Sequence, residues 1–169
     1  RTWNFCCACW RKKGKRKPKE KLMLAAHMDE VGLIITRITE EGYLHFTTVG
    51  GIDSRVLPGI QVKVGKKGIH GVIGSKAIHF LSSEELKKPA EIAQMYIDIG
   101  ASSREEAEKA VVPGDEVVFF SEFYRQERTV VSKALDDRAG CAVLIELIRR
   151  PLAYDMFFVF SVQEEIGTR

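Results

Sequence analysis

Two short apolar runs, separated by most of the chain, constrain its fold most strongly. Residues 21–26, apart from Lys21, and residues 156–162, apart from Ser161, are apolar, and each has the length of a strand buried in a sheet that is covered on both faces. Between them, residues 31–120 change to short β-type segments broken by turn signals such as Pro58-Gly59. Strands at such short, regular spacing predict a small barrel. We therefore expect an α/β fold in which a β-barrel is inserted between two pieces of one sheet.

The individual elements follow from the same patterns. Residues 21–26 are expected to form a central strand that places His27 at its carboxyl end, and residues 156–162 a second buried strand. Apolar stripes predict a helix over residues 136–149, and the capping-box spacing of Ser103 and Glu106 predicts a helical insertion over 102–110. A second helix, interrupted by Pro89, is expected over 83–95. The barrel strands are expected at residues 32–38, 43–48, 59–64, 71–73 and 115–120.

Length and composition indicate an ordinary globular protein. The chain has 169 residues, 45% of them hydrophobic and 29% charged, and no run approaches the roughly 20 apolar residues of a membrane span. No signal-peptide pattern is present, so we expect a cytoplasmic protein without a membrane partner. The spacing of Cys6, Cys7 and Cys9 is not that of zinc ligands. These cysteines are expected in an opening strand over residues 3–10, with Cys141 buried on the later helix.

Positive charge is concentrated at the start of the chain. Residues 1–21 carry nine lysine or arginine residues against one glutamate, a net charge of +8, so residues 22–169 sum to −5. Such a run is able to bind nucleic acid, but no aromatic residues are interleaved with the basic ones to stack on bases. Gly14 and Pro18 indicate a turn between two apolar segments. We therefore expect a solvated hairpin here and do not expect nucleic acid as a partner.

Three motifs that carry carboxylates follow apolar segments in a fixed order. They are Ala-His-Met-Asp-Glu at 26–30, Leu-Asp-Asp-Arg-Ala-Gly at 135–140 and Gln-Glu-Glu-Ile-Gly at 163–167. His27, Asp136 and Glu165 are ligands of the kind that divalent metals take. Because carboxyl ends of neighbouring strands in open α/β sheets bind ligands, we expect the three motifs to meet at one sheet edge.

Each motif also has a plain structural interpretation. A single histidine such as His27 is usually a satisfied core or surface residue, but Asp29 stands where it can accept a hydrogen bond from the second ring nitrogen. Asp136 could be only a helix cap. Glu164 and Glu165 could be solvated charges at a strand end; adjacent strand residues point to opposite sides, so different roles are expected for them. The three motifs together favour function over these interpretations.

Longer motifs connect the chain to a known family. They are Ala-His-Met-Asp-Glu-Val-Gly, Gly-Gly-Ile-Asp-Ser-Arg-Val-Leu-Pro-Gly, Tyr-Ile-Asp-Ile-Gly-Ala-Ser-Ser-Arg-Glu-Glu-Ala, Val-Pro-Gly-Asp, Lys-Ala-Leu-Asp-Asp-Arg-Ala-Gly and Val-Gln-Glu-Glu-Ile-Gly. Over residues 20–169 the chain resembles the dinuclear-metal aminopeptidases of the tetrahedral (TET) family, whose members are often named glutamyl aminopeptidase or endoglucanase.

The resemblance implies a role for each site residue. His27 would bind one of two divalent metal ions, zinc or cobalt, Glu165 the other, and Asp136 would bridge both. Asp29 would orient His27, and Glu164 would be the general base for a metal-bridging water that attacks the peptide carbonyl. The Asp136–Asp137 peptide bond is expected to be cis.

The resemblance also implies a domain organisation and partners. Residues 1–28 and 130–169 would belong to a zinc-peptidase-like sheet with flanking helices, and residues 29–129 to an inserted PDZ-like barrel that dimerises. Peptides would be the substrates, and dimers would build a homo-oligomeric shell of twelve subunits. The family supplies two further ligands, an Asp and a His, from sequence expected beyond Arg169, so we expect this chain to be a fragment. Residues 1–12 depart from the family pattern.

Two other functions stay open. An endoglucanase needs two carboxylates that flank a sugar, and neighbouring Glu164 and Glu165 are poorly arranged for that. Alternatively, the chain is a catalytically inactive fragment in which the barrel acts as an oligomerisation or peptide-binding module.

Overall fold

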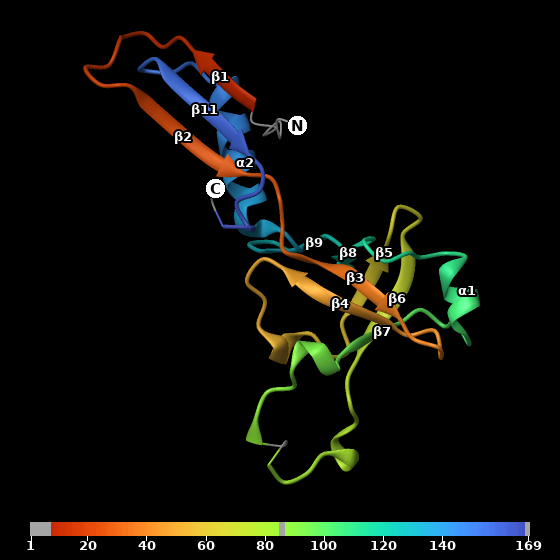
Figure 1. Ribbon diagram of the computed structural model, residues 1–169. Coiled ribbons are helices and arrows are strands. Elements are labelled where there is room, and N and C mark those ends of the chain that lie inside the picture. Colours follow the sequence, from red (N-terminus) through yellow and green to blue (C-terminus); the bar gives the residue numbers. More distant parts are fainter. Residues whose placement is uncertain (1–7, 85–86, 168–169) are drawn as a thin grey trace. The chain divides into compact units, whose positions relative to one another are not determined.

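The computed structural model describes residues 8–84 and 87–167 and divides into two compact units (Figure 1). One unit takes the chain up to Glu30 and again from Ala134, and the other is Val31–Lys133. The second unit is therefore an insertion in the sequence of the first. It contains a closed barrel and the first unit contains a sheet with a helix, which confirms the expected α/β fold with an inserted barrel. Within the described residues, no helix has both the length and the apolar character needed to cross a bilayer.

The first unit is a three-stranded sheet with one helix on it. Its strands are β1 (Ala8–Lys12), β11 (Met156–Ser161) and β2 (Leu22–His27), in the order β1-β11-β2. The central β11 runs parallel to β2 and antiparallel to β1, and helix α2 (Leu135–Arg149) packs against β2 (Figure 1). The core between sheet and helix consists of Ala26, Cys141, Leu144, Leu152 and Phe158, so Cys141 is buried on the helix as predicted.

Among the described strands, β2 pairs with β11 alone, so within this chain it lies at the edge of the sheet and not at the centre that its apolar sequence predicted. Three of its six side chains are exposed. Leu24 and Ala26 pack into the core under α2, but Met23, on the opposite face, is 66% exposed. An apolar run indicates burial and cannot indicate which neighbouring segments provide it. The opening strand was expected over residues 3–10; β1 spans Ala8–Lys12, and residues 3–7 lie outside the described part.

The basic segment after β1 is not a hairpin. Since β1 and β2 lie on opposite sides of β11, residues 13–21 cross from one edge of the sheet to the other. The segment follows the connection between α2 and β11, where Lys15 N donates to Leu152 O and Arg16 N to Ala153 O, both at 3.0 Å. Local turn signals located the bend correctly but could not show that a third strand lies between the two apolar segments.

The second unit is a closed six-stranded barrel. Its strand order is β3-β4-β7-β6-β5-β8, and each neighbouring pair is antiparallel. Inward-pointing apolar side chains fill it, with Leu44, Val62 and Ile97 among those that are fully buried. The strands are β3 (Gly32–Ile38), β4 (Leu44–Val49), β5 (Gln61–Val64), β6 (Ile69–Gly74), β7 (Tyr96–Asp98) and β8 (Glu116–Phe119).

Five of the six barrel strands were predicted to within a few residues. Strand β7 was missed because three residues are too few to show the alternation of apolar and polar side chains that indicates a strand. The short pair β9 (Tyr124–Arg125) and β10 (Val130–Val131) was missed for the same reason. The helix expected over 83–95 is wrong for the described residues there, which form no α-helix and contain the 3-10 segment Ile92–Gln94. Helix α1 (Arg104–Glu108) forms as predicted, with Ser103 Oγ accepting from Glu106 N.

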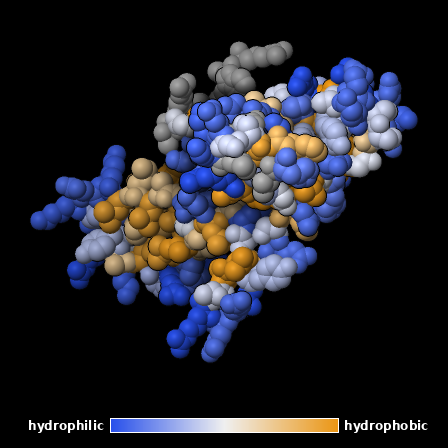
Figure 2. Space-filling model, turned by 90° about the horizontal axis from the view of Figure 1, so that it is seen from below, coloured by the Kyte–Doolittle hydropathy of each residue, from blue (hydrophilic) through white to orange (hydrophobic). Residues whose placement is uncertain are grey.

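Apolar side chains also reach the surface, as the orange areas in Figure 2 show. Among the described residues, the most exposed large ones are Phe80, Met23, Phe123 and Trp10, each more than 60% accessible.

The barrel core supports a first stability prediction. Ile97 is fully buried and pairs with Leu44 on β4 and Ile73 on β6, so Ile97→Ala removes packing on both sides and is expected to cost about 2–5 kcal/mol. The control Val72→Ala lies on β6 but is 44% exposed and should cost much less. Urea denaturation of both variants measures the difference; equal losses would contradict the central place of Ile97.

Asp53, in the Gly-Gly-Ile-Asp-Ser-Arg motif, supports a prediction about ionisation. Hydrogen bonds from the Arg55 side chain and backbone lower the pKa of the Asp53 carboxyl from about 3.8 to about 2. Because the folded pKa is depressed, the stabilisation is present above the unfolded value and is lost as the pH falls through about 2. An NMR titration of the carboxyl carbon should show this value, and Arg55→Gln should return it towards 3.8. An unchanged pKa in that variant would contradict the assignment.

Candidate metal centre

Parallel pairing of β2 and β11 brings the first and third motifs together. His27 and Ser161 are the last residues of the two strands and are paired in register, and Met28 N donates to Ser161 O at 2.8 Å. Both strands therefore end at the same edge of the sheet, as the sequence predicted. Glu164 and Glu165 follow β11 at that edge.

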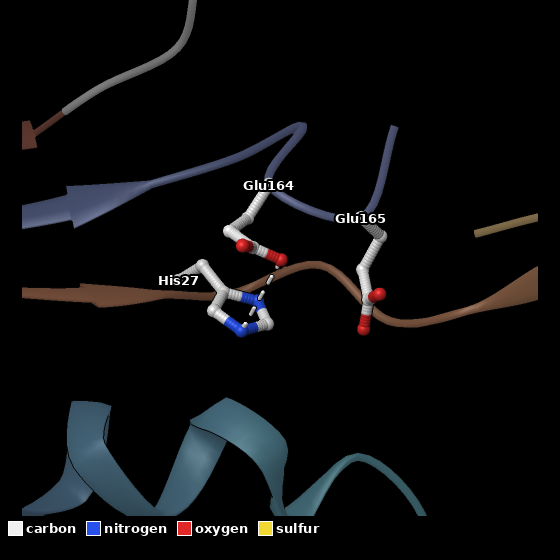
Figure 3. Close-up of side chains that lie close together, drawn as sticks. All are labelled: His27, Glu164 and Glu165. Carbon is white, nitrogen blue, oxygen red and sulfur yellow. Dashed lines mark ion pairs between the residues drawn. The ribbon is translucent and has the colours of Figure 1, made fainter. Parts of the chain in front are cut away.

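The His27 ring lies among carboxylates (Figure 3). Its Nε2 is 3.2 Å from Asp136 Oδ1 and 3.9 Å from Glu164 Oε2, and its Nδ1 is 3.5 Å from Asp29 Oδ1. One ligand atom each from His27, Glu164 and Glu165 lie within 4.8 Å of one another, the only such group of metal-ligating side chains in the described residues. Asp136 contacts His27 but does not belong to that group.

The two glutamates stand in a turn beyond the strand, where strand alternation no longer applies. Strand β11 ends at Ser161, and Gln163 has a positive φ of 70°. Both glutamate side chains reach the region of His27 from this turn (Figure 3). The expectation that they point to opposite sides of a strand is therefore wrong. Their separate roles stay a prediction.

Asp29 holds this turn in place. Its Oδ1 accepts from the Glu164 N–H at 3.3 Å and its Oδ2 from the Glu165 N–H at 3.2 Å. The buried His27 Nδ1 has no hydrogen-bond partner among the described residues, although Asp29 is near. The orienting role of Asp29 towards His27 thus stays a prediction. Its two hydrogen bonds with the glutamate turn were not predicted from the sequence. Its position two residues after His27 was the available signal.

Asp136 lies at the start of α2, but its side chain does not cap the helix. Asp137 Oδ1 accepts from Gly140 N at 3.1 Å, whereas Asp136 has an extended backbone and its side chain is 94% exposed. A Cβ on Gly140 would lie 2.2 Å from Asp137 Oδ1, so a larger residue there would displace this carboxylate. The Asp136–Asp137 peptide bond is cis, as the resemblance implied. The interpretation of Asp136 as a simple N-cap is therefore wrong, and its carboxylate is left to face His27.

Arg138 and Cys141 are two further residues of this region that sequence reasoning did not assign. Arg138 Nε donates to Met28 O at 3.1 Å, and its Nη2 is 3.4 Å from Glu30 Oε1. Cys141 Sγ donates to His27 O at 3.2 Å. These contacts tie the start of α2 to the segment that carries His27. Arg138 and Glu30 both belong to quoted motifs, which was the signal that could have found them.

Burial and neighbouring charges both shift the pKa values of His27 and Glu165 in this cluster. Burial lowers the pKa of His27, but the hydrogen bond with Asp136 and the charges of Asp29 and Glu164 outweigh it, so the pKa is raised above 6.5. Burial, followed by the neighbouring charge of Glu164, raises the pKa of Glu165. Carboxylates this close repel one another unless positive charge is present. The site therefore favours a cation.

The donor set fits a divalent metal ion. An imidazole with carboxylate oxygens is a ligand set that zinc and cobalt accept, and the buried His27 Nδ1 is a polar atom that no described residue satisfies with a hydrogen bond. A sheet with such a cluster at its carboxyl edge, interrupted by an inserted barrel, defines the class of this chain: an α/β protein with a candidate metal centre.

Within this class, the chain belongs to the M42 glutamyl aminopeptidase family, whose family model matches residues 7–169. It is 45% identical to a putative aminopeptidase of Acetivibrio thermocellus over 160 residues, which are 94% of this chain and 46% of that protein. The chain thus spans about half the length of the curated relatives it matches.

Solved structures agree with the fold. A TET aminopeptidase from the marine sediment archaeon Thaumarchaeota archaeon SCGC AB-539-E09 superimposes with a TM-score of 0.84 at 42% identity, over 95% of this chain and 48% of that one. The Pyrococcus horikoshii TET1 peptidase, which can assemble into a tetrahedron or a large octahedral shell, gives 0.77 at 42%, over 95% and 50%. A Thermotoga maritima protein named endoglucanase gives 0.76 at 39%, over 96% and 48%.

Proposed function

We propose that the protein to which this chain belongs is a metal-dependent aminopeptidase that removes N-terminal residues from peptides. The observation that carries the proposal is the meeting of His27, Glu164 and Glu165 at the ends of two parallel strands, in a chain of an aminopeptidase family. Asp136 adds a carboxylate 3.2 Å from the His27 ring.

Each residue has a task in this proposal. His27, Asp136 and Glu165 would hold two divalent ions, zinc or cobalt, with an Asp and a His from elsewhere in the protein. Such ions supply Lewis-acid polarisation of a carbonyl and a lowered pKa for a bound water. Glu164 would accept the proton of the attacking water and deliver it to the leaving amine. Asp29 would fix the turn that positions Glu164 and Glu165, because it accepts both of their backbone N–H groups.

The carboxylate geometry supports a peptidase over an endoglucanase. A glycosidase places its two carboxyl groups about 5–10 Å apart on either side of a sugar. Here one ligand atom each of Glu164, Glu165 and His27 lie within 4.8 Å of one another, an arrangement that suits a shared cation better than two carboxyl groups on either side of a sugar.

A homo-oligomer is part of the proposal. A similar structure forms closed shells, and we propose that the barrel unit mediates the dimers from which a twelve-subunit shell would be built. Gel filtration with light scattering tests this, and a monomer at micromolar concentration would overturn it. If metal is absent as well, the chain would be an oligomerisation or peptide-binding module.

The activity test uses the longest natural protein that contains this chain. After chelation and return of zinc or cobalt, it should release the first residue of a peptide with a free N-terminus and leave the N-acetylated peptide intact. Failure to cleave either peptide, or equal cleavage of both, would overturn the proposal. New reducing ends from carboxymethylcellulose would favour the endoglucanase.

A further inference from the structure

The segment between β1 and β2 carries lysine at every second position. Residues 13, 15, 17, 19 and 21 are all lysine, and residues 8–21 contain eight basic side chains against the single acid Glu20. All five lysines are exposed, as are Arg16 and Glu20, whereas Lys12, Gly14 and Pro18 are half-buried. The segment bends at residues 15, 19 and 20, and the five lysines face water along its whole length.

The Lys12 side chain and the backbone of residues 14–16 anchor the segment. Lys12 Nζ donates to Ile148 O and to Arg150 O at the carboxyl end of α2. Gly14 N donates to Asp155 Oδ1 at 2.9 Å, and a Cβ on Gly14 would lie 2.2 Å from the carbonyl carbon of Tyr154. Arg16 forms a parallel bridge with Tyr154. The lysines therefore project from a backbone that is tied down along the α2–β11 connection.

Within the described residues, the side chains of the five lysines make no hydrogen bond and no ion pair. Lys17 is near enough to Asp155 to help lower the pKa of that carboxyl, which Gly14 N and Arg11 lower more strongly. The lysines at 17, 19 and 21 line a hollow of about 370 Å³, in which four basic side chains, counting Arg11, face the two carboxylates of Glu20 and Asp155. Such a row of like charges destabilises a chain unless an anion neutralises it.

We propose that residues 13–21 form a binding surface for the phosphate backbone of single-stranded nucleic acid. The row reaches about 28 Å at most, so its five ammonium groups can contact several phosphates along one strand. An acidic peptide would gain little from exposed ion pairs with lysine, whereas a nucleic acid gains from the release of condensed counterions without burying the contact.

Tertiary structure also supplies the aromatic ring that the local sequence lacks. Tyr154 is 43% exposed and is bridged to Arg16 in the middle of the row, so its ring is available to stack on an unpaired base. The surface lies at the start of β2 and the metal cluster at its end, so the proposal does not depend on the peptidase activity.

The test measures binding of a fluorescent 20-nucleotide single-stranded DNA by anisotropy, with the full natural protein, between 50 and 300 mM KCl. Changing all five lysines of the row to Gln should weaken binding at least 30-fold at 50 mM KCl. It should also reduce the slope of log K against log [KCl] by about 3.5, at about 0.7 for each lost contact. A control changes five exposed lysines elsewhere, Lys66, Lys67, Lys87, Lys88 and Lys109, and should leave the affinity within twofold.

A second variant keeps the test valid if the Gln variant fails to fold. Changing the same five lysines to Arg preserves the charge and should retain binding within threefold. No binding by the unaltered protein at 50 mM KCl, an equal loss in the control variant, or a poly-glutamate peptide that binds as tightly as the oligonucleotide would each overturn the proposal.

Discussion

Glu164→Gln is expected to lower kcat by about 10²–10⁴-fold while the metal content stays unchanged. The amide keeps the size of the side chain, whose Oε2 is 3.9 Å from His27 Nε2, but it cannot accept the proton of the attacking water. Steady-state kinetics on a peptide with a free N-terminus, combined with elemental analysis of the same sample, measure both quantities.

Glu165→Gln is the matched comparison. The two residues are neighbours in one turn, but Glu165 is the proposed ligand, so its variant should lose metal together with activity. Near-normal turnover by Glu164→Gln, or a loss of metal large enough to explain its lower rate, would contradict the assignment of Glu164 as the base.

Asp29→Asn is expected to weaken metal binding by about 10–100-fold, the usual effect of removing a group that orients ligands. Asp29 accepts the N–H groups of Glu164 and Glu165 on its two oxygens. Asparagine has one acceptor oxygen, so its NH2 group would face one of these donors and the turn would lose its fixed position. Competition with a chromogenic chelator measures the metal affinity.

Asp155→Asn provides the control for this substitution. Asp155 lies just before the other end of β11, where it accepts from Gly14 N and Arg11. That change should affect the loop at residues 13–21 and leave metal affinity unaltered. Equal metal affinities for both variants and the parent protein would show that the hold of Asp29 on the turn is unimportant for the site.

Where prediction from sequence succeeded, the signal was local or repeated. Strand β3 matches its predicted bounds, and the Ser103 cap identified α1, because these features depend on neighbours within a few residues. Prediction failed where the partner is distant. Strand β7 has three residues and exists only because β4 and β6 lie on either side of it in the barrel.

The candidate site shows the same difference between local signals, which the sequence contains, and contacts with distant residues, which it does not reveal. Sequence alone identified His27, Asp29, Asp136, Glu164 and Glu165 as a set, since carboxylates and a histidine that follow apolar segments are chemically conspicuous. It could not show that Asp137 is the helix cap or that Asp29 receives two backbone N–H groups, because these contacts depend on the turn geometry after β11.

The sequence by itself therefore determined the kind of fold, the inserted barrel and the set of candidate site residues, because hydrophobic period and residue chemistry are local properties. Only the tertiary structure decided that β11 lies between β1 and β2, that the glutamates reach His27 from a turn, and that the basic segment crosses the sheet with its lysines outward. Strand order and side-chain direction depend on pairing between segments far apart in the chain, which no local pattern encodes.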